Sequence, residues 1–305
     1  MKKFIGIFSI LIIVVLIVQT ITTKDAKKSS TNSIGVSTFA LYDITKHIVG
    51  DTQKLFIMMP FGVDIHSFEP TPQLIAKIQN STLVIYNGAG LQHWIEDFNF
   101  KNKSIDMSKY VKLKKVQKHT HHEEDEHHHG AIDSHYWLDI SNMIKMTQVI
   151  TKELISISPK DKDFYTKNEQ SYISMLEKLD NDFKTKLSEC KKDTIIVNHN
   201  AFSYLSDRYG FHSVALSGLS PDAQPDAKTM IKLIKTVKEH NLSTVFFESF
   251  ASDKAMKSIA KEAHVKVDVL QALGNITADE AKKDMSYEDI MRENLDKISK
   301  ALECK

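Results

Sequence analysis

Apolar and polar residues along this chain are arranged so that short strands alternate with helices over most of its length. Strands that alternate with helices of this size favour βαβ units and a mainly parallel sheet. In the first part of the chain, strands are expected at residues 34–38, 55–58 and 82–86, and helices at 43–49 and 72–79.

Two helices, the second of them long, interrupt this alternation. Helical spacing of apolar residues predicts one helix over 139–156 and another over 161–190, with Pro159 between them. No stretch rich in glycine, serine or proline adjoins the long helix, so it is expected to be a stiff connector. A stiff connector predicts small movements of the parts it joins rather than wide hinge closure.

The alternation then resumes and predicts a second lobe. The chain is therefore expected to fold as an α/β protein with two lobes, 34–157 and 191–305, joined by a rigid linking helix at 160–190. Open α/β sheets bind ligands outside the carboxyl ends of their strands, so the crevice between the lobes is the expected binding site. In the second lobe, strands are expected at 194–197, 212–216, 244–247 and 266–270, and helices at 201–209, 226–240, 252–263 and 287–302.

The first 23 residues have the features of an export signal. Two lysines follow Met1, and residues 4–18 form an apolar run broken only by Gly6 and Ser9. The run is shorter than the about 20 apolar residues that a membrane-spanning helix needs. An uncleaved anchor is the alternative, because no clear cleavage motif follows. No cysteine adjoins the run, so a lipid anchor is not expected, and the predicted location is the periplasm.

Composition and charge narrow the function classes. The formal net charge of the 305 residues is +1 at pH 7, so no basic field exists to attract nucleic acid. The only cysteines are Cys190 and Cys304. In an oxidising compartment two cysteines suggest one disulfide, with two free thiols as the alternative, and they exclude a thiolate zinc cluster.

One segment, 119–129 within a predicted loop at 117–134, holds six histidines and four carboxylates in eleven residues. It has neither helical nor strand periodicity. Imidazole and carboxylate together are ligands for borderline divalent metals, so auxiliary low-affinity metal binding is predicted. A solvated charged loop that binds metal incidentally is the alternative. The histidines are His119, His121, His122, His127, His128 and His129.

Three further histidines stand at loops that face the predicted crevice. His66 follows the second strand, His135 precedes the helix at 139–156, and His199 ends the first strand of the second lobe. Three converging imidazoles suit Zn²⁺. The other isolated histidines fall within predicted helices or a strand, where a core or surface role is expected; they are His47, His93, His212, His240 and His264.

Four segments carry a resemblance to a known family. GVDIHSFEPTP, SHYWLDI, VNHNAFSYLSDRYGF and TVFFESFAS occur in order and resemble the cluster A-I (cluster 9) substrate-binding proteins of bacterial ABC metal importers. The histidine tract resembles the zinc-specific ZnuA branch. The resemblance covers nearly the whole chain after the export signal. It implies two lobes with four-stranded sheets, a rigid backbone helix, and a metal held between the lobes for delivery to an inner-membrane permease with a cytoplasmic ATPase.

The resemblance also implies a set of metal ligands. His66, His135 and His199 match the family's three nitrogen ligands. Manganese- and iron-type members typically have glutamate at the third position and aspartate at a fourth, whereas this chain has His199 and Gln271. Both departures remove negative charge and hard oxygen, which shifts the preference from Mn²⁺ toward Zn²⁺.

The fourth ligand is left open by the sequence. Water, Glu69 or the amide oxygen of Gln271 are candidates, with water or Glu69 favoured. Three neutral histidines leave a bound Zn²⁺ with its full charge, and carboxylates often orient ligating imidazoles. Glu69, Asp268 and Glu248 are candidates for this compensation.

The predicted function is capture of Zn²⁺ between the lobes and its delivery, without chemistry, by a monomer that hands the ion to an ABC permease. A manganese- or iron-binding relative of the same family is one alternative. A zinc hydrolase with three histidines is another, because such sites can activate water. No nucleophile–base pair stands beside the three histidines in the sequence, which argues against an enzyme.

Overall fold

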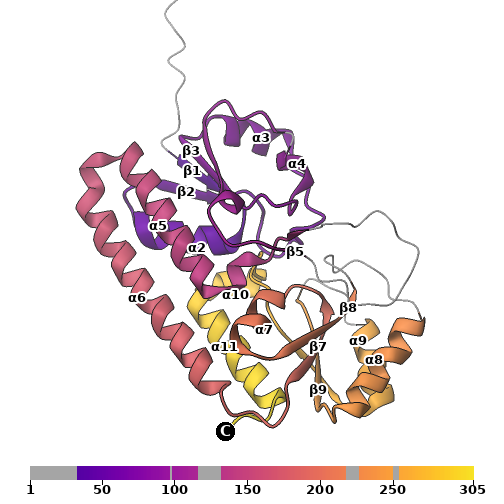
Figure 1. The fold of residues 1–305 in the computed structure, drawn as a ribbon. Helices are drawn as coiled ribbons and strands as arrows, with labels where there is room; N and C mark the ends of the chain where they lie inside the picture. Colours follow the sequence, from indigo (N-terminus) through magenta and orange to yellow (C-terminus); the bar gives the residue numbers. More distant parts are fainter. Residues whose placement is uncertain (1–32, 97, 116–131, 218–226, 250–253) are drawn as a thin grey trace, which may run out of the picture.

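The structure, a computed structural model, describes residues 33–96, 98–115, 132–217, 227–249 and 254–305. Two α/β lobes lie beside one long helix (Figure 1). The export signal expected at 1–23 and the histidine tract at 119–129 lie outside the described residues. In the parts of the chain that are described, no helix is both long and apolar enough to cross a bilayer.

The first lobe contains a parallel sheet of four strands in the order β2-β1-β3-β4. The residues of the central strands β1 and β3 are buried apart from Tyr86, as expected of parallel strands covered on both faces. The edge strand β4 buries only Ile105 fully, and the sequence pattern did not predict it. The four-stranded sheet implied by the family resemblance is therefore present here. The strands are β1 (Ser33–Val36), β2 (Lys54–Ile57), β3 (Leu83–Tyr86) and β4 (Lys103–Asp106).

Local signals set the helix ends in this lobe. Thr38 caps the first helix by accepting a hydrogen bond from the backbone N–H of Leu41. Thr71 caps the next helix, which begins at Pro72 and matches the predicted 72–79. A two-strand hairpin stem flanks the histidine tract. These elements are α2 (Phe39–Val49), α3 (Pro72–Gln79), α4 (His93–Glu96), β5 (Lys114–Lys115) and β6 (Ile132–Asp133).

The predicted connector is α6 (Lys162–Lys186), which follows α5 (Ile140–Ile157) after a short 3₁₀ turn. It ends four residues earlier than the predicted 190. Its first half packs on α2, where the Tyr172 hydroxyl donates to a carboxylate oxygen of Asp43 at 2.6 Å. Its second half packs on α11, where Arg292 pairs with Asp182 at 2.8 Å. The helix therefore contacts both lobes along its length.

The second lobe contains the four predicted strands, arranged as two parallel pairs, β7–β8 and β9–β10. Strands β7 and β9 lie side by side (Figure 1). The predicted fold class, two mainly parallel α/β lobes joined by a long helix, is confirmed, although the strands of the second lobe pair as two two-stranded sheets rather than as the expected four-stranded sheet. The elements are β7 (Thr194–His199), α7 (Ser203–Tyr209), β8 (His212–Ser217), α8 (Ala227–Glu239), β9 (Thr244–Phe247), α9 (Lys254–Ala263), β10 (Lys266–Val269), α10 (Ala278–Lys282) and α11 (Tyr287–Ala301).

The hydrophobic interior does not divide where the lobes divide. A large cluster, here called the shared core, runs from the first sheet through α6 into β7, α7 and α11. A smaller cluster, the outer core, lies under α8 and α9 at the far end of the second lobe. The outer core consists of Ile196, Leu216, Leu233, Val237, Leu242, Val245, Met256, Ile259 and Ala260.

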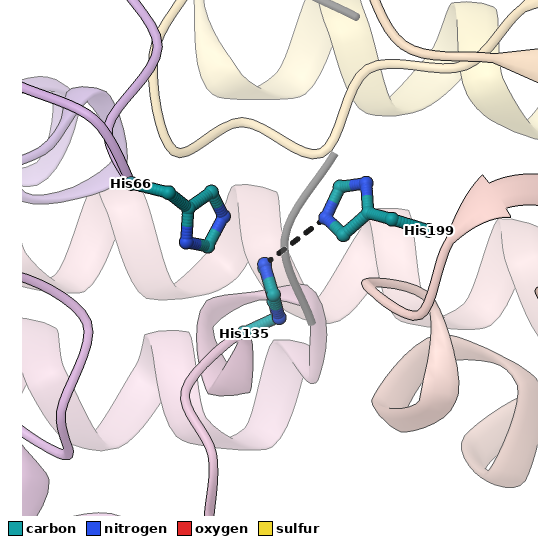
Figure 2. Close-up of side chains that lie close together, drawn as sticks. All are labelled: His66, His135 and His199. Carbon is teal, nitrogen blue, oxygen red and sulfur yellow. Dashed lines mark hydrogen bonds between the residues drawn. The ribbon is translucent and has the colours of Figure 1, made fainter. Parts of the chain in front are cut away.

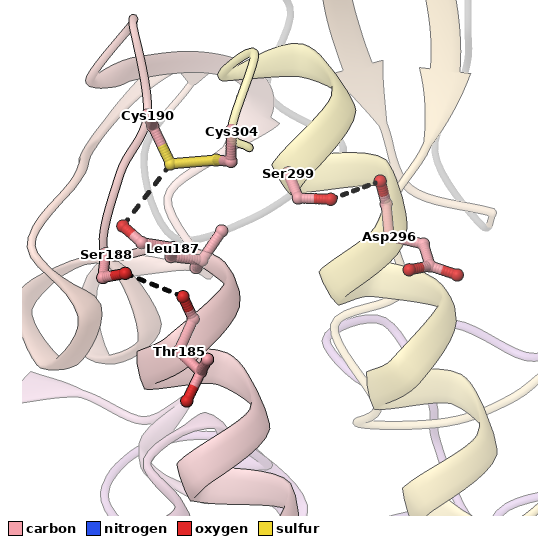
Figure 3. Close-up of a disulfide and its surroundings, with 7 residues drawn as sticks. All are labelled: Thr185, Leu187, Ser188, Cys190, Asp296, Ser299 and Cys304. Carbon is pink, nitrogen blue, oxygen red and sulfur yellow. Dashed lines mark hydrogen bonds between the residues drawn. A yellow bond between two sulfur atoms is a disulfide. The ribbon is translucent and has the colours of Figure 1, made fainter.

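A disulfide joins Cys190 and Cys304, which are separated by 114 positions in the sequence (Figure 3). Cys190 lies just beyond the end of α6, and Cys304 just beyond the end of α11. Backbone hydrogen bonds run beside the bridge, including Lys192 N–H to the Leu302 carbonyl at 3.0 Å. The predicted bridge is thus present, and it ties the end of the chain to the connecting helix.

Candidate metal centre

Three histidines from separate loops converge between the lobes (Figure 2). His66 lies in the loop after β2, His135 lies between β6 and a 3₁₀ turn at Tyr136–Leu138, and His199 ends β7. One ring nitrogen from each lies within 4.8 Å of the others. Among the described residues, no other group of histidine, cysteine or carboxylate side chains meets this criterion for a metal site.

The spacing of these nitrogens fits a shared ion. Nε2 of His135 and Nε2 of His199 are 3.4 Å apart. Two nitrogens bound tetrahedrally to one zinc at 2.0–2.1 Å lie about 3.3–3.4 Å apart. The His66 ring is close to both others, with ring centroids 5.4 and 5.7 Å from those of His135 and His199. Small ring rotations would therefore bring three nitrogens to one point.

The His66 loop is anchored by a segment from the opposite half of the chain. The side-chain amide of Asn275 donates to the Pro60 and Val63 carbonyls, both at 2.8 Å. The Gly62 N–H donates to the Ile276 carbonyl at 2.9 Å. Gly62 has φ of +88°, a conformation that glycine adopts without strain. These contacts hold His66 near the crevice although its own ring has a partly exposed edge.

Buried carboxylates stand behind two of the three rings. Nδ1 of His135 is 2.9 Å from Oδ1 of Asp133. Nδ1 of His199 is 2.9 Å from Oε1 of Glu248, although the two groups are not aligned as a hydrogen bond. In both rings Nε2 is left facing the centre of the cluster. A hydrogen-bonded carboxylate fixes the tautomer and orientation of a ligating imidazole, as Asp133 does for His135.

Of these carboxylates, sequence reasoning named Glu248 and missed Asp133. The signal was present, because Asp133 stands two residues before His135 and a ligating histidine usually has such a partner. Glu69 is exposed and lies outside the cluster, and Asp268 is exposed on β10. The structure therefore does not bring either of these carboxylates to the three histidines.

Gln271 does line the small cavity beside the cluster, together with His66, His135 and Glu248. The cavity has a volume of about 20 Å³, which is enough for one water molecule. Nε2 of Gln271 donates to the Ser249 hydroxyl at 2.8 Å and to both carboxylate oxygens of Glu280 at 2.7 and 2.8 Å. These bonds fix the amide, so its nitrogen is turned toward Glu280.

Burial controls the charge of the cluster. Desolvation, followed by repulsion from the neighbouring histidines, lowers the pKa of His66 to about 2. Desolvation and His135 lower the pKa of His199 to about 3. Burial raises the pKa of Glu248 to about 8. The rings of His66 and His199 are thus neutral near pH 7, which is the form that binds metal.

Acid is expected to destabilise the metal-free protein through the same two rings. Histidine in an unfolded chain has a pKa of about 6.5. Below that pH these two histidines bind protons in the unfolded state but not in the folded state. The free energy of unfolding therefore decreases as the pH falls from that value toward the folded-state pKa values of about 2 for His66 and about 3 for His199. Urea unfolding at several pH values should show a loss of up to about 1.4 kcal/mol per pH unit for each histidine.

The matched variants for this measurement are His66→Gln and His240→Gln, since His240 is exposed and lies outside the cluster. The first should have a shallower dependence of stability on pH than the unmodified protein, and the second should not. Equal slopes for all three proteins would show that His66 is freely protonated in the folded state.

Two α/β lobes, a rigid helix between them and a buried three-histidine cluster at their junction define a solute-binding protein of the metal-binding class. The sequence pattern of one family, described as zinc-uptake complex component A, periplasmic, matches residues 34–301. The chain belongs to this ZnuA family, as the four sequence segments predicted.

This chain matches nearly the whole length of some relatives and only part of others. The high-affinity zinc uptake system protein ZnuA of Bacillus subtilis is 33% identical, over 99% of this chain and 98% of its own. The zinc-binding protein AdcA of Streptococcus pyogenes serotype M1 is 30% identical over 98% of this chain, but this chain spans only 61% of its length.

Solved structures share the fold. The laminin-binding protein Lmb of Streptococcus agalactiae, described as having adhesin and metal-transporting activity, is similar with a TM-score of 0.79 and 29% identity, over 88% of this chain and 99% of its own. The Zn(II)-bound ZnuA-like domain of AdcA from Streptococcus pneumoniae has a TM-score of 0.73 and 29% identity, over 89% and 99% of the two chains.

Proposed function

We propose that this protein binds one Zn²⁺ through His66, His135 and His199 and delivers it to an ABC-type zinc importer. The observation that carries the proposal is the 3.4 Å separation of the His135 and His199 Nε2 atoms, with a nitrogen of His66 close by. Membership of the zinc-uptake family and the Zn(II)-bound relative support it. The ion is cargo, and no reaction is assigned to the site.

The donor set favours zinc over manganese or iron. All three converging ligands are imidazole nitrogens, and the carboxyl groups of Asp133 and Glu248 contact the far sides of the His135 and His199 rings. Mn²⁺ prefers carboxylate and water oxygen, whereas Zn²⁺ accepts imidazole readily. A fourth position, filled by water or by the Gln271 amide oxygen in the small cavity, completes a tetrahedral site.

Competition between metals tests this function. Purified metal-free protein titrated with Zn²⁺ in the presence of a chelating dye should bind one ion tightly, and a large excess of Mn²⁺ should not displace it. Tighter binding of Mn²⁺ than of Zn²⁺ would refute the assignment and favour the manganese-type alternative.

The proposed function implies specific transporter partners and a cellular location for the protein. The partners are an inner-membrane permease and its cytoplasmic ATPase, and the protein acts as a periplasmic monomer after the signal at 1–23 is removed. The family description as a periplasmic component of a zinc-uptake complex supports this placement.

The histidine tract is proposed to collect zinc weakly and separately from the cluster. A deletion of residues 119–129 should remove the additional weak zinc equivalents seen in a titration and leave one tight equivalent unchanged. Its control is a variant in which the six histidines become asparagine at unchanged length. Loss of the tight equivalent in either variant would mean that the cluster is not the main site.

A further inference from the structure

A group of hydrogen bonds crosses from the hairpin stem of the first lobe to α7 of the second. The Ser203 hydroxyl donates to Oδ2 of Asp133. The Tyr204 hydroxyl donates to the Asp133 carbonyl at 2.8 Å and accepts from the Lys114 N–H at 2.8 Å. Asp133, Ser203 and Tyr204 are here called the interlobe bridge.

The other end of α7 is held as well. The Arg208 guanidinium donates to Asp139, the N-cap of α5, at 3.0 Å and to Asp180 of α6 at 2.7 Å. The Tyr209 hydroxyl donates to the same Asp180 oxygen at 2.8 Å. Helix α7 is therefore fixed at both ends by groups outside the second lobe.

The bridge is connected to both buried histidines of the cluster. Asp133 uses one carboxylate oxygen for Nδ1 of His135 and the other for Ser203. Ser203 follows His199 by four residues, and the Ala201 N–H closes the turn between them on the His199 carbonyl at 2.9 Å. The path from His135 to His199 thus consists of two hydrogen bonds of Asp133 and the five residues from His199 to Ser203.

A bound ion would close this path into a ring, because Nε2 of both histidines faces the same point. When one histidine of such a ring dissociates from the ion, the remaining links hold it close to the ion. It therefore rebinds before the ion escapes. A ligand held in place in this way gains affinity mainly by slower dissociation.

We propose that the interlobe bridge, and the Ser203 hydroxyl in particular, sets how long the ion stays bound. Ser203 acts as a positioning residue: it holds the Asp133 carboxylate, which orients His135 against His199. The proposal rests on the proposed function. It adds that both separation of the lobes and release of zinc require the Ser203–Asp133 hydrogen bond to break.

The test compares Ser203→Ala with Ser206→Ala in the full chain. Ser206 is on the same helix and lines the same cavity of about 530 Å³, but its hydroxyl donates only to the Ser203 carbonyl within α7. Asp133 and Ser203 line that cavity too, so water can solvate the carboxylate after the substitution and the fold is expected to persist. Zinc dissociation into excess chelator is measured by stopped flow.

The expected result is dissociation about tenfold faster for Ser203→Ala, from the loss of one hydrogen bond to a charged acceptor, and an unchanged rate for Ser206→Ala. Ser203→Thr, which keeps a hydroxyl, should dissociate zinc as slowly as the unmodified protein. The visible spectrum of the Co²⁺-loaded protein should shift in Ser203→Ala and not in Ser206→Ala, because only the former alters the orientation of a ligand.

Equal dissociation rates for Ser203→Ala and the unmodified protein would overturn the proposal, as would failure of threonine to restore the rate. Neither result would touch the proposed function, which fails instead if the unmodified protein has no tight zinc equivalent. A Ser203→Ala chain with a lower urea midpoint but an unchanged Co²⁺ spectrum and rate would assign the bridge a purely structural role and also refute the proposal.

Discussion

Replacement of His199 by alanine is expected to lower the affinity for Zn²⁺ about a thousandfold. Binding of zinc to structural sites contributes about 10–16 kcal/mol near neutral pH. Loss of one of three nitrogens then removes on the order of 4 kcal/mol, and each 1.4 kcal/mol is about a factor of ten. Competition with a chelator of known affinity measures the change. His199 is fully buried, so the folded state of the variant is checked first by urea unfolding.

The control is His212→Ala, since His212 is an exposed histidine on β8 outside the cluster. Its affinity should equal that of the unmodified protein, whereas His135→Ala should resemble His199→Ala. An affinity in His199→Ala within a few-fold of the unmodified protein would mean that the three rings do not share an ion.

Removal of the disulfide by the double change Cys190→Ser and Cys304→Ser should destabilise the protein by about 3–5 kcal/mol, because an open chain gains conformational freedom on unfolding. The disulfide closes a long loop, since its cysteines are 114 positions apart in the sequence. Urea unfolding with the zinc site empty measures the loss. Zinc affinity should hardly change, since the disulfide lies beyond the ends of α6 and α11 and contains none of the residues of the histidine cluster (Figure 3).

The matched measurement is the unmodified protein with and without a reductant. Reduction should lower its urea midpoint to that of the double serine variant and leave the variant itself unchanged. An unmodified protein insensitive to reductant would show that the two cysteines contribute nothing to stability as a pair.

Much of the fold could be predicted because its main elements have strong periodicity or strong end signals. Helix α3 was predicted to the residue from its helical periodicity, and in the structure Thr71 and Pro72 form its first turn. The strand β4 was missed because, of its four residues, only Ile105 is apolar, as befits an edge strand. Helix α10 was missed because five residues give no periodicity, although Thr277 and Glu280 form a capping box that the sequence displays.

The convergence of His66, His135 and His199 was predicted from their placement on loops that face the expected crevice and from the family resemblance. What the sequence could not supply was the direction of side chains in the loops. Glu69 is three residues from His66, yet it points to solvent, whereas Asp133 lies behind His135. Backbone torsions in the loops determine these side-chain directions, and hydrophobic periodicity does not predict those torsions.

The unequal division of the interior has a mechanical consequence. Strand β7 and helices α7 and α11 belong to the same hydrophobic cluster as the first sheet and α6. The inner half of the second lobe is therefore expected to unfold together with the first lobe. The end under α8 and α9 has a separate hydrophobic cluster, and a smaller separate cluster lies on the first sheet at Met58, Ile78, Val84 and Ile95. A local opening under α8 and α9 can proceed by itself, so this end of the second lobe can unfold locally while the packing around the three histidines stays intact.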